Sequence, residues 1–337
     1  MNKHLGEIWQ VVDSRNFGGI ESHILQLSQG LQIMGLTPRV VFLNHYGEHP
    51  LFRLLKKANI PYLVRKACSI QSLIKTHQPA LIHTHGYKAG IVMRIIGRLS
   101  GTPVISTYHA GETPKGKVWL YDWIDRYTGH LAKWRFAVSA SIQQKLPTHA
   151  EQAKNFINSR QLTKGDGQQV AFVGRLSFEK GINQLIAIAK QLPHVDIHVY
   201  GDGPAKQQLL SARLKNLHLH GQQHHMPHVW RQIGLLLLPS LQEGLPMVAL
   251  EAMARGIPVV ASRVGALPEL ITHKKNGWLI NVGDIHGYCQ AIMRWHALPA
   301  IQQASLSRKA KKVVDTDYSV EAVMPHFIQR YRQAMCG

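Results

Sequence analysis

Long apolar runs are missing from this sequence of 337 residues. The densest run, Leu235 to Leu238, stops at Pro239, whereas a helix that spans a bilayer needs roughly 20 apolar residues. The opening residues, MNKHLGE, also lack the apolar stretch of roughly 7 to 15 residues that marks a secretion signal. We therefore expect no transmembrane helix and a location in the cytoplasm.

Cysteine is scarce as well. Cys68, Cys289 and Cys336 are the three cysteines of the chain, and they lie far apart in the sequence. An odd number at such spacing fits neither a disulfide framework nor a metal site built from cysteine pairs. We expect all three to be reduced thiols.

Acidic residues are few: 19 Asp and Glu against 39 Lys and Arg give a net charge of +20. From His49 through Gly111 there is no acidic residue. That stretch contains nine basic residues, namely Arg53, Lys56, Lys57, Arg65, Lys66, Lys75, Lys88, Arg94 and Arg98. We expect a strongly positive surface on the first half of the chain. Such a surface suits nucleic acid, anionic lipid or a phosphorylated small molecule, and composition does not choose among these or exclude a merely soluble basic surface.

What the chain does contain is an alternation of short apolar runs with longer amphipathic stretches, at 45% hydrophobic residues overall. This pattern predicts repeated βα units and an α/β fold with parallel sheets. The predicted strands are 7–12, 39–43, 62–64, 80–83, 103–107, 135–138, 169–173, 196–200, 235–238 and 258–261. Predicted helices cover 20–34 and 89–99 and begin near residues 182, 205, 247, 285 and 320. The polar segment 147–168 interrupts the series, so we place a domain boundary there.

Glycine-rich turns follow two of the predicted strands. Gly18 and Gly19 open a helix, where backbone amides and the helix dipole favour a phosphate, although the same pair is also typical of a tight turn. Arg175 and Lys180 flank the turn after the strand 169–173. Together these two cations can neutralise a diphosphate, and the alternative is that both are solvated surface charges.

Two carboxylates stand out in the second half. Glu243 lies in a glycine loop after a strand, and Glu251 follows in a helix otherwise made of Met, Val, Ala and Leu. A carboxylate in so apolar a helix costs free energy unless it has a partner, and the vicinal hydroxyls of a sugar or ribose are suitable donors. The alternative is that Glu251 faces water on the polar stripe of an amphipathic helix.

Taken in order, these motifs resemble the retaining glycosyltransferases of family 4, also called glycosyl transferases group 1. The matching residues are Gly18-Gly19-Ile20-Glu21 with His23, His83-Thr84-His85-Gly86, Thr107-Tyr108-His109, Val138-Ser139, Gly174-Arg175-Leu176, Glu179-Lys180-Gly181, Gly201-Asp202-Gly203-Pro204, the pair Glu243 and Glu251, and Gly265 through Glu269. The resemblance covers nearly the whole length. It departs at Phe156-Ile157-Asn158-Ser159, where the family often has Asn-Gly, and at Ala266, where a second glycine is common.

The resemblance implies the GT-B fold, with two facing Rossmann-like domains and an interdomain cleft. Residues 1–160 would form an N-terminal acceptor-binding domain and residues 161–318 a C-terminal domain that binds a nucleotide sugar. Residues 319–337 would form a helix that crosses back to the first domain. Arg175 and Lys180 would hold the nucleotide diphosphate, which Gly18 and Gly19 would approach from the other domain.

The remaining site residues follow from the same resemblance. His109 would lie by the anomeric centre and Glu243 would contact the donor sugar. Backbone amides near Gly244 and Leu245 would add donors, and Glu251 would hold the ribose hydroxyls. In this family the leaving phosphate is thought to accept the acceptor's proton on the same face, so no protein nucleophile is required.

The resemblance and the charges together predict an enzyme that moves a sugar, with retention, from a nucleotide sugar to a glycan or lipid-linked acceptor in bacterial surface polysaccharide or lipopolysaccharide synthesis. Cations and amides can stabilise the leaving group without a metal or other cofactor. The basic region 49–111 would dock on the anionic inner face of the membrane. A sugar-nucleotide epimerase of the same fold is the alternative. A nucleic-acid-binding protein is a second alternative, but we see no interleaved aromatics or recognition helix and expect no nucleic acid partner.

Two patterns resemble metal sites. Asp315-Thr316-Asp317 resembles the Asp-x-Asp motif of metal-dependent transferases, but it follows all the predicted strands. Five histidines crowd one segment, at positions 218, 220, 224, 225 and 228, with irregular spacing and no cysteine. We expect no metal site, and we interpret the histidine segment as a polar loop near the nucleotide base.

Overall fold

The computed structural model of the protein describes residues 6–65, 69–109, 117–223 and 226–336. The chain folds into two compact units: unit 1 is Met1–Asn158 with Val320–Gly337, and unit 2 is Ser159–Ser319. The sequence placed these boundaries after residues 160 and 318. Within the described ranges, no helix combines the length and the apolar character needed to cross a membrane. Cys289 and Cys336 are free thiols, and Cys68 lies outside the described residues.

Unit 1 is built on a seven-stranded parallel sheet in the order β3-β2-β1-β4-β5-β6-β7. Its strands are β1 (Ile8–Val12), β2 (Pro38–Phe42), β3 (Tyr62–Val64), β4 (Leu81–His85), β5 (Val104–Tyr108), β6 (Trp134–Ala137) and β7 (Glu151–Gln152). Its helices are α1 (Gly19–Ile33), α2 (Pro50–Lys57), α3 (Ile70–His77), α4 (Tyr87–Ser100), α5 (Lys117–Tyr127), α6 (Ala140–Gln143) and α14 (Val320–Cys336). Single turns of 3-10 helix occupy Thr128–Leu131 and Ser159–Gln161, the second of these at the start of unit 2.

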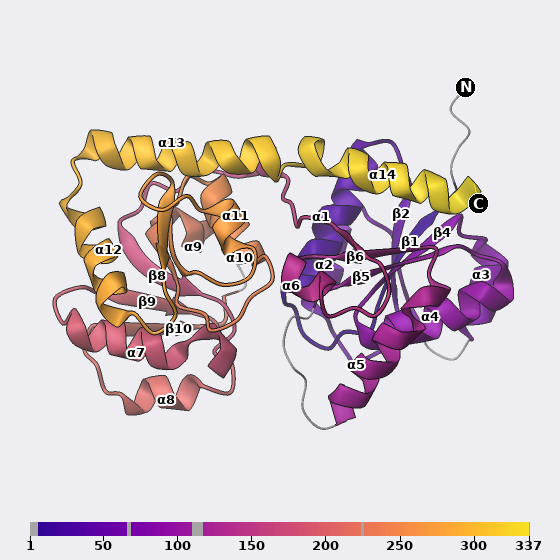
Figure 1. Ribbon diagram of the computed structural model, residues 1–337, viewed down its shortest axis with the longest axis horizontal. Coiled ribbons are helices and arrows are strands. Elements are labelled where there is room, and N and C mark those ends of the chain that lie inside the picture. Colours follow the sequence, from indigo (N-terminus) through magenta and orange to yellow (C-terminus); the bar gives the residue numbers. More distant parts are fainter. Residues whose placement is uncertain (1–5, 66–68, 110–116, 224–225, 337) are drawn as a thin grey trace. The chain divides into compact units, whose positions relative to one another are not determined.

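Helices cover both faces of this sheet (Figure 1) because its strands bury alternate side chains on opposite sides. Ile8 packs in a core with α1 and α14, whereas its neighbour Trp9 packs in a core with α3 and α4. Helix α14 is tied to the sheet by a buried hydrogen bond of 2.6 Å between Tyr331 and His83. Arg330 on the same helix pairs with Glu151 of β7. The last helix is therefore an integral part of unit 1.

Unit 2 repeats the plan with a six-stranded parallel sheet in the order β10-β9-β8-β11-β12-β13. Its strands are β8 (Gln169–Val173), β9 (Ile197–Tyr200), β10 (Leu217–Gly221), β11 (Ile233–Leu238), β12 (Val259–Ser262) and β13 (Gly277–Ile280). Its helices are α7 (Ile182–Gln191), α8 (Lys206–Ser211), α9 (Met226–Gln232), α10 (Met247–Ala254), α11 (Leu267–Leu270), α12 (Ile285–Ala297) and α13 (Ala300–Asp317), with a 3-10 turn at Phe178–Lys180. The four leucines from Leu235 to Leu238 are all buried because β11 lies centrally, between β8 and β12.

Both sheets share the strand order of Rossmann-like domains, in which the chain starts in the middle, builds outward to one edge and then returns to build the other. The order reverses between β1 and β4 in unit 1 and between β8 and β11 in unit 2. Ligands of such sheets bind beyond the carboxyl ends of the strands at this switch point. The predicted α/β fold with two Rossmann-like domains is confirmed.

Two predictions about connecting segments need correction. The segment 147–168 is only partly a linker, because β7 lies in it and Phe156 is fully buried in the core of unit 1. The histidine segment is not a loop either: His218 and His220 belong to the edge strand β10, and His228 to helix α9. Residues 224–225 lie outside the described residues. Phe156 packs in the same core as α1 and α14, and β10 pairs with β9, so contacts with other elements order these parts of both segments in spite of their polar composition.

Candidate functional site

The switch point of unit 2 carries a paired cation and carboxylate. Lys180, in the turn after β8, donates from Nζ to both oxygens of Glu243, at 2.7 and 2.8 Å. Ser240, just after β11, donates to the same carboxylate at 2.8 Å. The Glu243 side chain is 7% exposed and that of Lys180 is 25% exposed. The structure therefore brings together two predicted site residues that are 63 positions apart.

Close backbone contacts hold these two turns together. The amide of Leu241 donates to the carbonyl of Glu179 at 2.8 Å. Gly181 has φ +72°, and a Cβ there would lie 1.7 Å from the carbonyl oxygen of Pro239. Gly265, at φ +56°, would place a Cβ 2.3 Å from the carbonyl oxygen of Glu243. Only glycine fits at such contacts, so these residues position the Glu243 loop.

Arg175 and Glu251 occupy different environments. Arg175 is exposed in the turn after β8. Glu251 is partly buried on α10, a helix without any exposed residue, so it does not lie on a solvated stripe. The Arg255 guanidinium donates to the backbone carbonyl of Glu251 at 2.8 Å, and burial lowers the pKa of Arg255. Gly244 is partly buried and Leu245 is buried at the start of the same loop and helix.

The switch point of unit 1 begins with Gly18 and Gly19. Gly18 precedes α1, and its amide donates to the Glu21 carboxylate at 2.7 Å. This is one half of a capping box, because glycine has no side chain to accept the second hydrogen bond. Both glycines are exposed, and a Cβ on Gly19 would meet no atom within 4 Å. The backbone at Gly19 is thus open to approach by a ligand.

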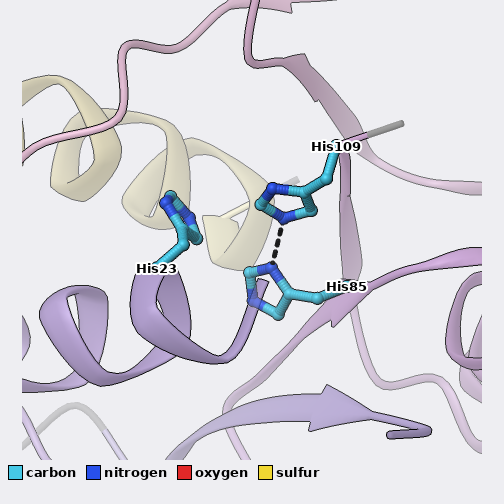
Figure 2. A group of neighbouring side chains, drawn as sticks. All are labelled: His23, His85 and His109. Atoms are coloured by element: carbon cyan, nitrogen blue, oxygen red, sulfur yellow. Dashed lines mark hydrogen bonds between the residues drawn. The ribbon is translucent and has the colours of Figure 1, made fainter. Parts of the chain in front are cut away.

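His109, at the end of β5, does not stand alone. Its ring lies against those of His85 and His23, with centroids 5.3 and 4.8 Å away (Figure 2). His85 ends β4, and His23 comes from α1. Burial lowers the pKa of His85 and His109 well below 6.5 and that of His23 to about 4, so all three rings are neutral at pH 7.

A chain of hydrogen bonds sets the protonation of two of these rings, His85 and His109. His85 Nε2 lies 2.8 Å from the Gln10 carbonyl oxygen Oε1, which can only accept, so this nitrogen carries the proton of His85. His85 Nδ1 therefore accepts from His109 Nε2 at 3.0 Å. A neutral imidazole has one proton, so His109 Nδ1 is left as a hydrogen-bond acceptor. It suits a ligand hydroxyl rather than an anion.

The same three histidines have the composition of a metal site. One ring nitrogen from each lies within 4.8 Å of the others, and neutral imidazole is a ligand of zinc and other transition metals. Gln10 would then orient His85 from behind, as outer partners of metal ligands do. The sequence analysis did not name His23 and His85 as site residues. The signal that could have found them is the pair of histidines on either side of Thr84, together with His23 on the first helix, α1.

The Asp-x-Asp pattern has a structural role. Asp315 lies within α13, where it accepts from the Ser159 hydroxyl at 2.7 Å and pairs with Lys311 at 3.1 Å. These contacts hold the first residues of unit 2 to its last long helix.

A pocket of about 480 Å³ lies in unit 1 beside the histidines. His85 and His109 line it together with apolar and aromatic side chains such as Val118 and Tyr121 of α5. The cations Arg15 and Lys88 also line it, and Lys88 pairs with Asp13 at 3.1 Å. Asp13, Glu21, Asp122 and Asp125 line it as well, so the pocket joins neutral hydrogen-bonding groups, an apolar wall and charges of both signs.

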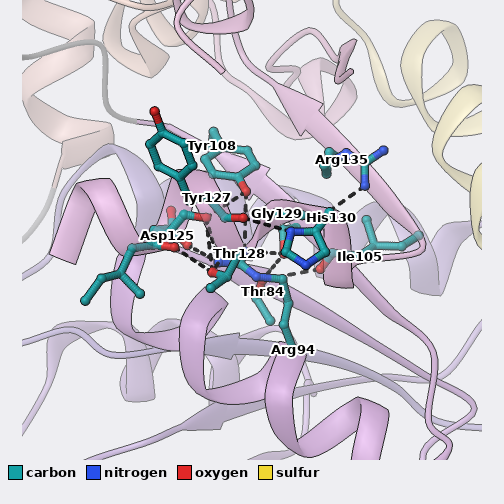
Figure 3. Close-up of polar contacts among 12 residues, drawn as sticks. Thr84, Arg94, Ile105, Tyr108, Asp125, Tyr127, Thr128, Gly129, His130 and Arg135 are labelled. Carbon is teal, nitrogen blue, oxygen red and sulfur yellow. Dashed lines mark hydrogen bonds and ion pairs between the residues drawn. The ribbon is translucent and has the colours of Figure 1, made fainter. Parts of the chain in front are cut away.

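A buried ion pair between α4 and α5 corrects the expectation that all nine basic residues of the stretch 49–111 lie on the surface. Arg94, counted above toward a positive surface, is fully buried and pairs with Asp125 at 2.6 Å (Figure 3). It also donates to Thr128, to Ser106 and to the backbone of Asp125. Burial raises the pKa of Asp125 to about 6, and the Arg94 charge opposes that rise. This network fixes α5 to α4.

Comparison with known proteins agrees with the geometry of both units. The model of the family described as Glycosyltransferase Family 4 matches residues 17–154, and the model described as Glycosyl transferases group 1 matches residues 167–297. The first match contains the histidines of unit 1, and the second contains Arg175, Lys180, Glu243 and Glu251.

Individual relatives are distant. Glycogen synthase of Mycobacterium tuberculosis is 24% identical over 294 residues, which cover 78% of this chain and 71% of the relative. A galactosyltransferase of Escherichia coli, named for transfer from UDP-Gal to alpha-D-GlcNAc-diphosphoundecaprenol, is 25% identical over 68% of this chain and 70% of its own. The crystal structure of Anabaena Alr3699/HepE with UDP-glucose superimposes with a TM-score of 0.82 at 19% identity, covering 97% of this chain and 99% of the other. The chain therefore belongs to the group 1, family 4 glycosyltransferases and has their GT-B fold.

Proposed function

We propose that this glycosyltransferase moves a sugar from a nucleotide diphosphate sugar to a glycan or lipid-linked acceptor, with retention of configuration at the anomeric carbon. The observation that carries the proposal is the Lys180–Glu243 pair at the switch point of unit 2, with Arg175 exposed after the same strand. A cation there is held in place before the donor arrives, and it is partly open to solvent. Fixed charges of this kind stabilise a leaving group without reorganising during the reaction.

The proposed chemistry breaks the bond between the anomeric carbon and the leaving phosphate oxygen. The acceptor oxygen forms its new bond on the same face, and its proton passes to the leaving phosphate. Negative charge grows on the diphosphate as the bond breaks, and Lys180 and Arg175 would stabilise it. Glu243 would release part of its hold on Lys180 and accept from a sugar hydroxyl, while Glu251 would accept from the ribose hydroxyls.

Unit 1 would contribute neutral groups. His109 Nδ1 is the acceptor left by the hydrogen-bond chain through His85, so it would bind a hydroxyl of the transferring sugar. The open backbone at Gly19 would admit a phosphate oxygen close to the first turn of α1. In this proposal the reaction needs no metal ion, and His85 and His109 act through their hydrogen bonds.

The relatives guide the choice of substrates to test. One is named for a UDP-sugar and a lipid diphosphate acceptor, and another crystallised with UDP-glucose. A third carries a putative role in colanic acid biosynthesis in its name. We propose on this basis that the protein acts in bacterial surface polysaccharide synthesis, in the cytoplasm at the inner face of the membrane, and that uridine donors are the first to test.

The test is thermal stabilisation by UDP, GDP, ADP, CMP and their sugars in buffer with EDTA, followed by the anomeric configuration of the product by NMR. A ligand at about 100 times its dissociation constant adds about 2.7 kcal/mol to the free energy of unfolding. We expect one nucleotide to raise the melting temperature of the wild type, and Arg175→Ala and Glu251→Ala to lose that rise. An inverted product would contradict retention, and stabilisation by no nucleotide would contradict the donor class.

A further inference from the structure

Helix α5 has the opposite arrangement of side chains to an ordinary surface helix, which buries apolar residues and exposes charged ones. Its carboxylates point inward: Asp125 pairs with buried Arg94, and Asp122 pairs with Arg126 at 2.6 Å (Figure 3 shows the Arg94 network). Its large apolar side chains point outward. Those exposed by roughly half are Val118, Trp119, Leu120, Tyr121, Trp123 and Tyr127. The ion pairs fix this orientation of the helix, and an exposed apolar face of this kind is typical of a site that meets a partner.

The outer face has a defined shape. Trp119, Trp123 and Tyr127 recur every fourth residue, so they form a stripe along one side of the helix, and the rings of Trp123 and Tyr127 touch at 4.7 Å. Val118 and Tyr121 instead line the 480 Å³ pocket. One edge of α5 therefore borders the pocket that contains His109, and another edge faces solvent.

Helix α4, which packs beside α5 (Figure 1), extends this surface. It exposes Val92, Ile95 and Leu99, at a spacing that places them on one face. Of the 16 large hydrophobic residues that are exposed in the described part of the chain, nine are on α4 or α5. These nine residues are concentrated on two neighbouring helices, whereas exposed hydrophobic residues are normally scattered singly over a protein surface.

The exposed charged side chains of these two helices are basic. Helix α4 has no acidic residue and exposes Arg98 and Lys88, the second of which pairs with Asp13 next to the pocket. The two acids of α5 are buried or paired, so within the described residues the outer sides of both helices offer no free carboxylate. Tryptophan and tyrosine concentrate at the boundary between lipid and water, and each basic residue near an anionic surface adds about 1 kcal/mol of attraction.

We propose that α5, together with the exposed stripe of α4, docks unit 1 on an anionic lipid bilayer. This deepens the proposed function, on which it rests, because it places the pocket of unit 1 at the membrane where a lipid-linked acceptor resides. It also moves the docking surface from the basic region 49–111 as a whole to two helices, one of them outside that region. A second copy of the chain fits this face less well, because it would bring another net charge of +20 against the same cations.

The test is binding of the full-length protein to phosphatidylcholine vesicles with and without phosphatidylglycerol. The wild type is expected to co-sediment with the anionic vesicles, and Trp119→Ser with Trp123→Ser to weaken binding by about tenfold or more. The matched control is Leu210→Ser with Ile301→Ser, which removes two exposed apolar side chains from unit 2 and should leave vesicle binding unchanged. Equal binding of the wild type to both kinds of vesicle, or equal loss in both double variants, would overturn the proposal.

Tryptophan emission gives a second, local readout. Trp119 and Trp123 are about half exposed, whereas Trp9, Trp230, Trp278 and Trp295 are buried. Anionic vesicles should therefore shift the wild-type emission to shorter wavelength, and the tryptophan double variant should show no shift.

Two further measurements separate the outcomes. Nucleotide stabilisation of the tryptophan double variant should match that of the wild type, which shows that the variant folds and that donor binding is intact. If the wild type binds nucleotide but no vesicles, this inference fails while the proposed function stands; if it binds vesicles but no nucleotide, the proposed function fails alone. A wild-type dimer in sedimentation velocity that the tryptophan changes dissociate, without vesicle binding, would assign the face to a second copy and overturn the proposal.

Discussion

The two units share a strand order but place opposite chemistry at their switch points. Unit 2 presents charged groups: Lys180 held by Glu243, with Arg175 exposed nearby in the sequence. Unit 1 presents three imidazoles that burial keeps neutral and a pocket with an apolar wall. The groups that end the strands are charged and partly solvated in the first case, and they are neutral, buried rings in the second. The same fold therefore offers one edge suited to an anion and another suited to hydroxyl groups.

This contrast extends to the way each unit is held together. The unit 2 turns meet through backbone contacts at Gly181 and Gly265. The unit 1 region depends on buried polar side chains, above all the Arg94–Asp125 pair. Breaking a buried charge pair leaves the other charge unpartnered in a medium of low dielectric constant. The units should differ accordingly in their response to mutation and pH.

The largest effect is expected from breaking that pair in unit 1. Arg94→Met leaves Asp125 buried without its cation and should cost about 3–5 kcal/mol of the free energy of unfolding of unit 1. Hydrogen exchange at β4 and β5 measures it. Arg39→Met is the control, because its pair with Glu7 is about one-fifth exposed and should contribute about 1 kcal/mol or less. If Arg94→Met with Asp125→Leu is no more stable than Arg94→Met alone, the buried charge is not the cause.

In unit 2 the largest effect is expected on catalysis. Lys180→Ala removes the cation that would stabilise the leaving diphosphate and should lower kcat by about 10²–10³-fold, as loss of a preorganised donor does. Steady-state kinetics with the donor identified by thermal stabilisation measures this. Lys311→Ala breaks a lysine–aspartate pair on α13 and should leave kcat unchanged. If the kcat of Lys180→Ala is within about threefold of the wild-type kcat, Lys180 does not stabilise the leaving group.

Acid should affect unit 1 through its histidines. The pKa of His23 falls from 6.5 to about 4 on folding, so its contribution to stability is complete above pH 6.5 and is lost as the pH falls toward 4. A shift of this size corresponds to about 3 kcal/mol. Chemical unfolding at pH 7 and pH 4.5 should show a loss in the wild type that is smaller in His23→Gln. The exposed His286→Gln in unit 2 should lose as much as the wild type.

The contribution of Asp125 to stability changes with pH in the opposite direction to that of His23, so the two contributions must be measured separately. Its pKa rises to about 6 on folding, so its contribution is complete below its unfolded pKa near 3.8 and is lost as the pH rises through 6. Asp125→Asn should therefore make the acid loss of unit 1 steeper. A shallower loss in that variant would contradict the assignment of the raised pKa.

Substitution of Gly19 in unit 1 and of Gly265 in unit 2 should have smaller effects, which differ in kind between the two units. Gly19→Ala places a methyl group in open space, so the free energy of unfolding should change by less than about 0.5 kcal/mol while the KM for the donor rises about tenfold. Gly265→Ala forces a left-handed backbone and a clash with the Glu243 loop and should cost about 1–2 kcal/mol or more. Thermal melting and kinetics measure both. An unchanged KM for Gly19→Ala would show that the donor does not reach unit 1 there.

The smallest effect is expected from metal removal. EDTA should leave the initial rate unchanged, because the proposed reaction uses Lys180 and Arg175 in place of a metal ion. Zinc should likewise leave the melting temperature unchanged within the error of the measurement. A rise in melting temperature with zinc that His23→Ala abolishes would show that the three histidines hold a metal and would contradict this proposal.

Much of the fold and of the unit 2 site was predictable from sequence. The predicted strands of both units lie within a few residues of β1 to β6, β8, β9, β11 and β12, because parallel strands buried on both faces read as apolar runs between helical stretches. Lys180 and Glu243 were predictable because each stands in a glycine turn directly after such a strand. Three strands were missed because their apolar pattern is too weak. Strand β7 has only two residues, the edge strand β10 is rich in histidine, and the edge strand β13 begins with glycine.

The sequence by itself determined the order of the βα units, the family, and the charged turns of unit 2, because these depend on residues that are neighbours in the chain. Tertiary structure alone decided that His23, His85 and His109 meet, that Arg94 is an internal group rather than a surface charge, and that α5 faces its acids inward and its tryptophans outward. The physical reason is that the environment of a polar group depends on partners contributed from elsewhere in the chain. A parallel sheet brings the ends of distant strands to one edge, and only there is it settled which charges are paired, which rings are neutral and which apolar side chains are left exposed.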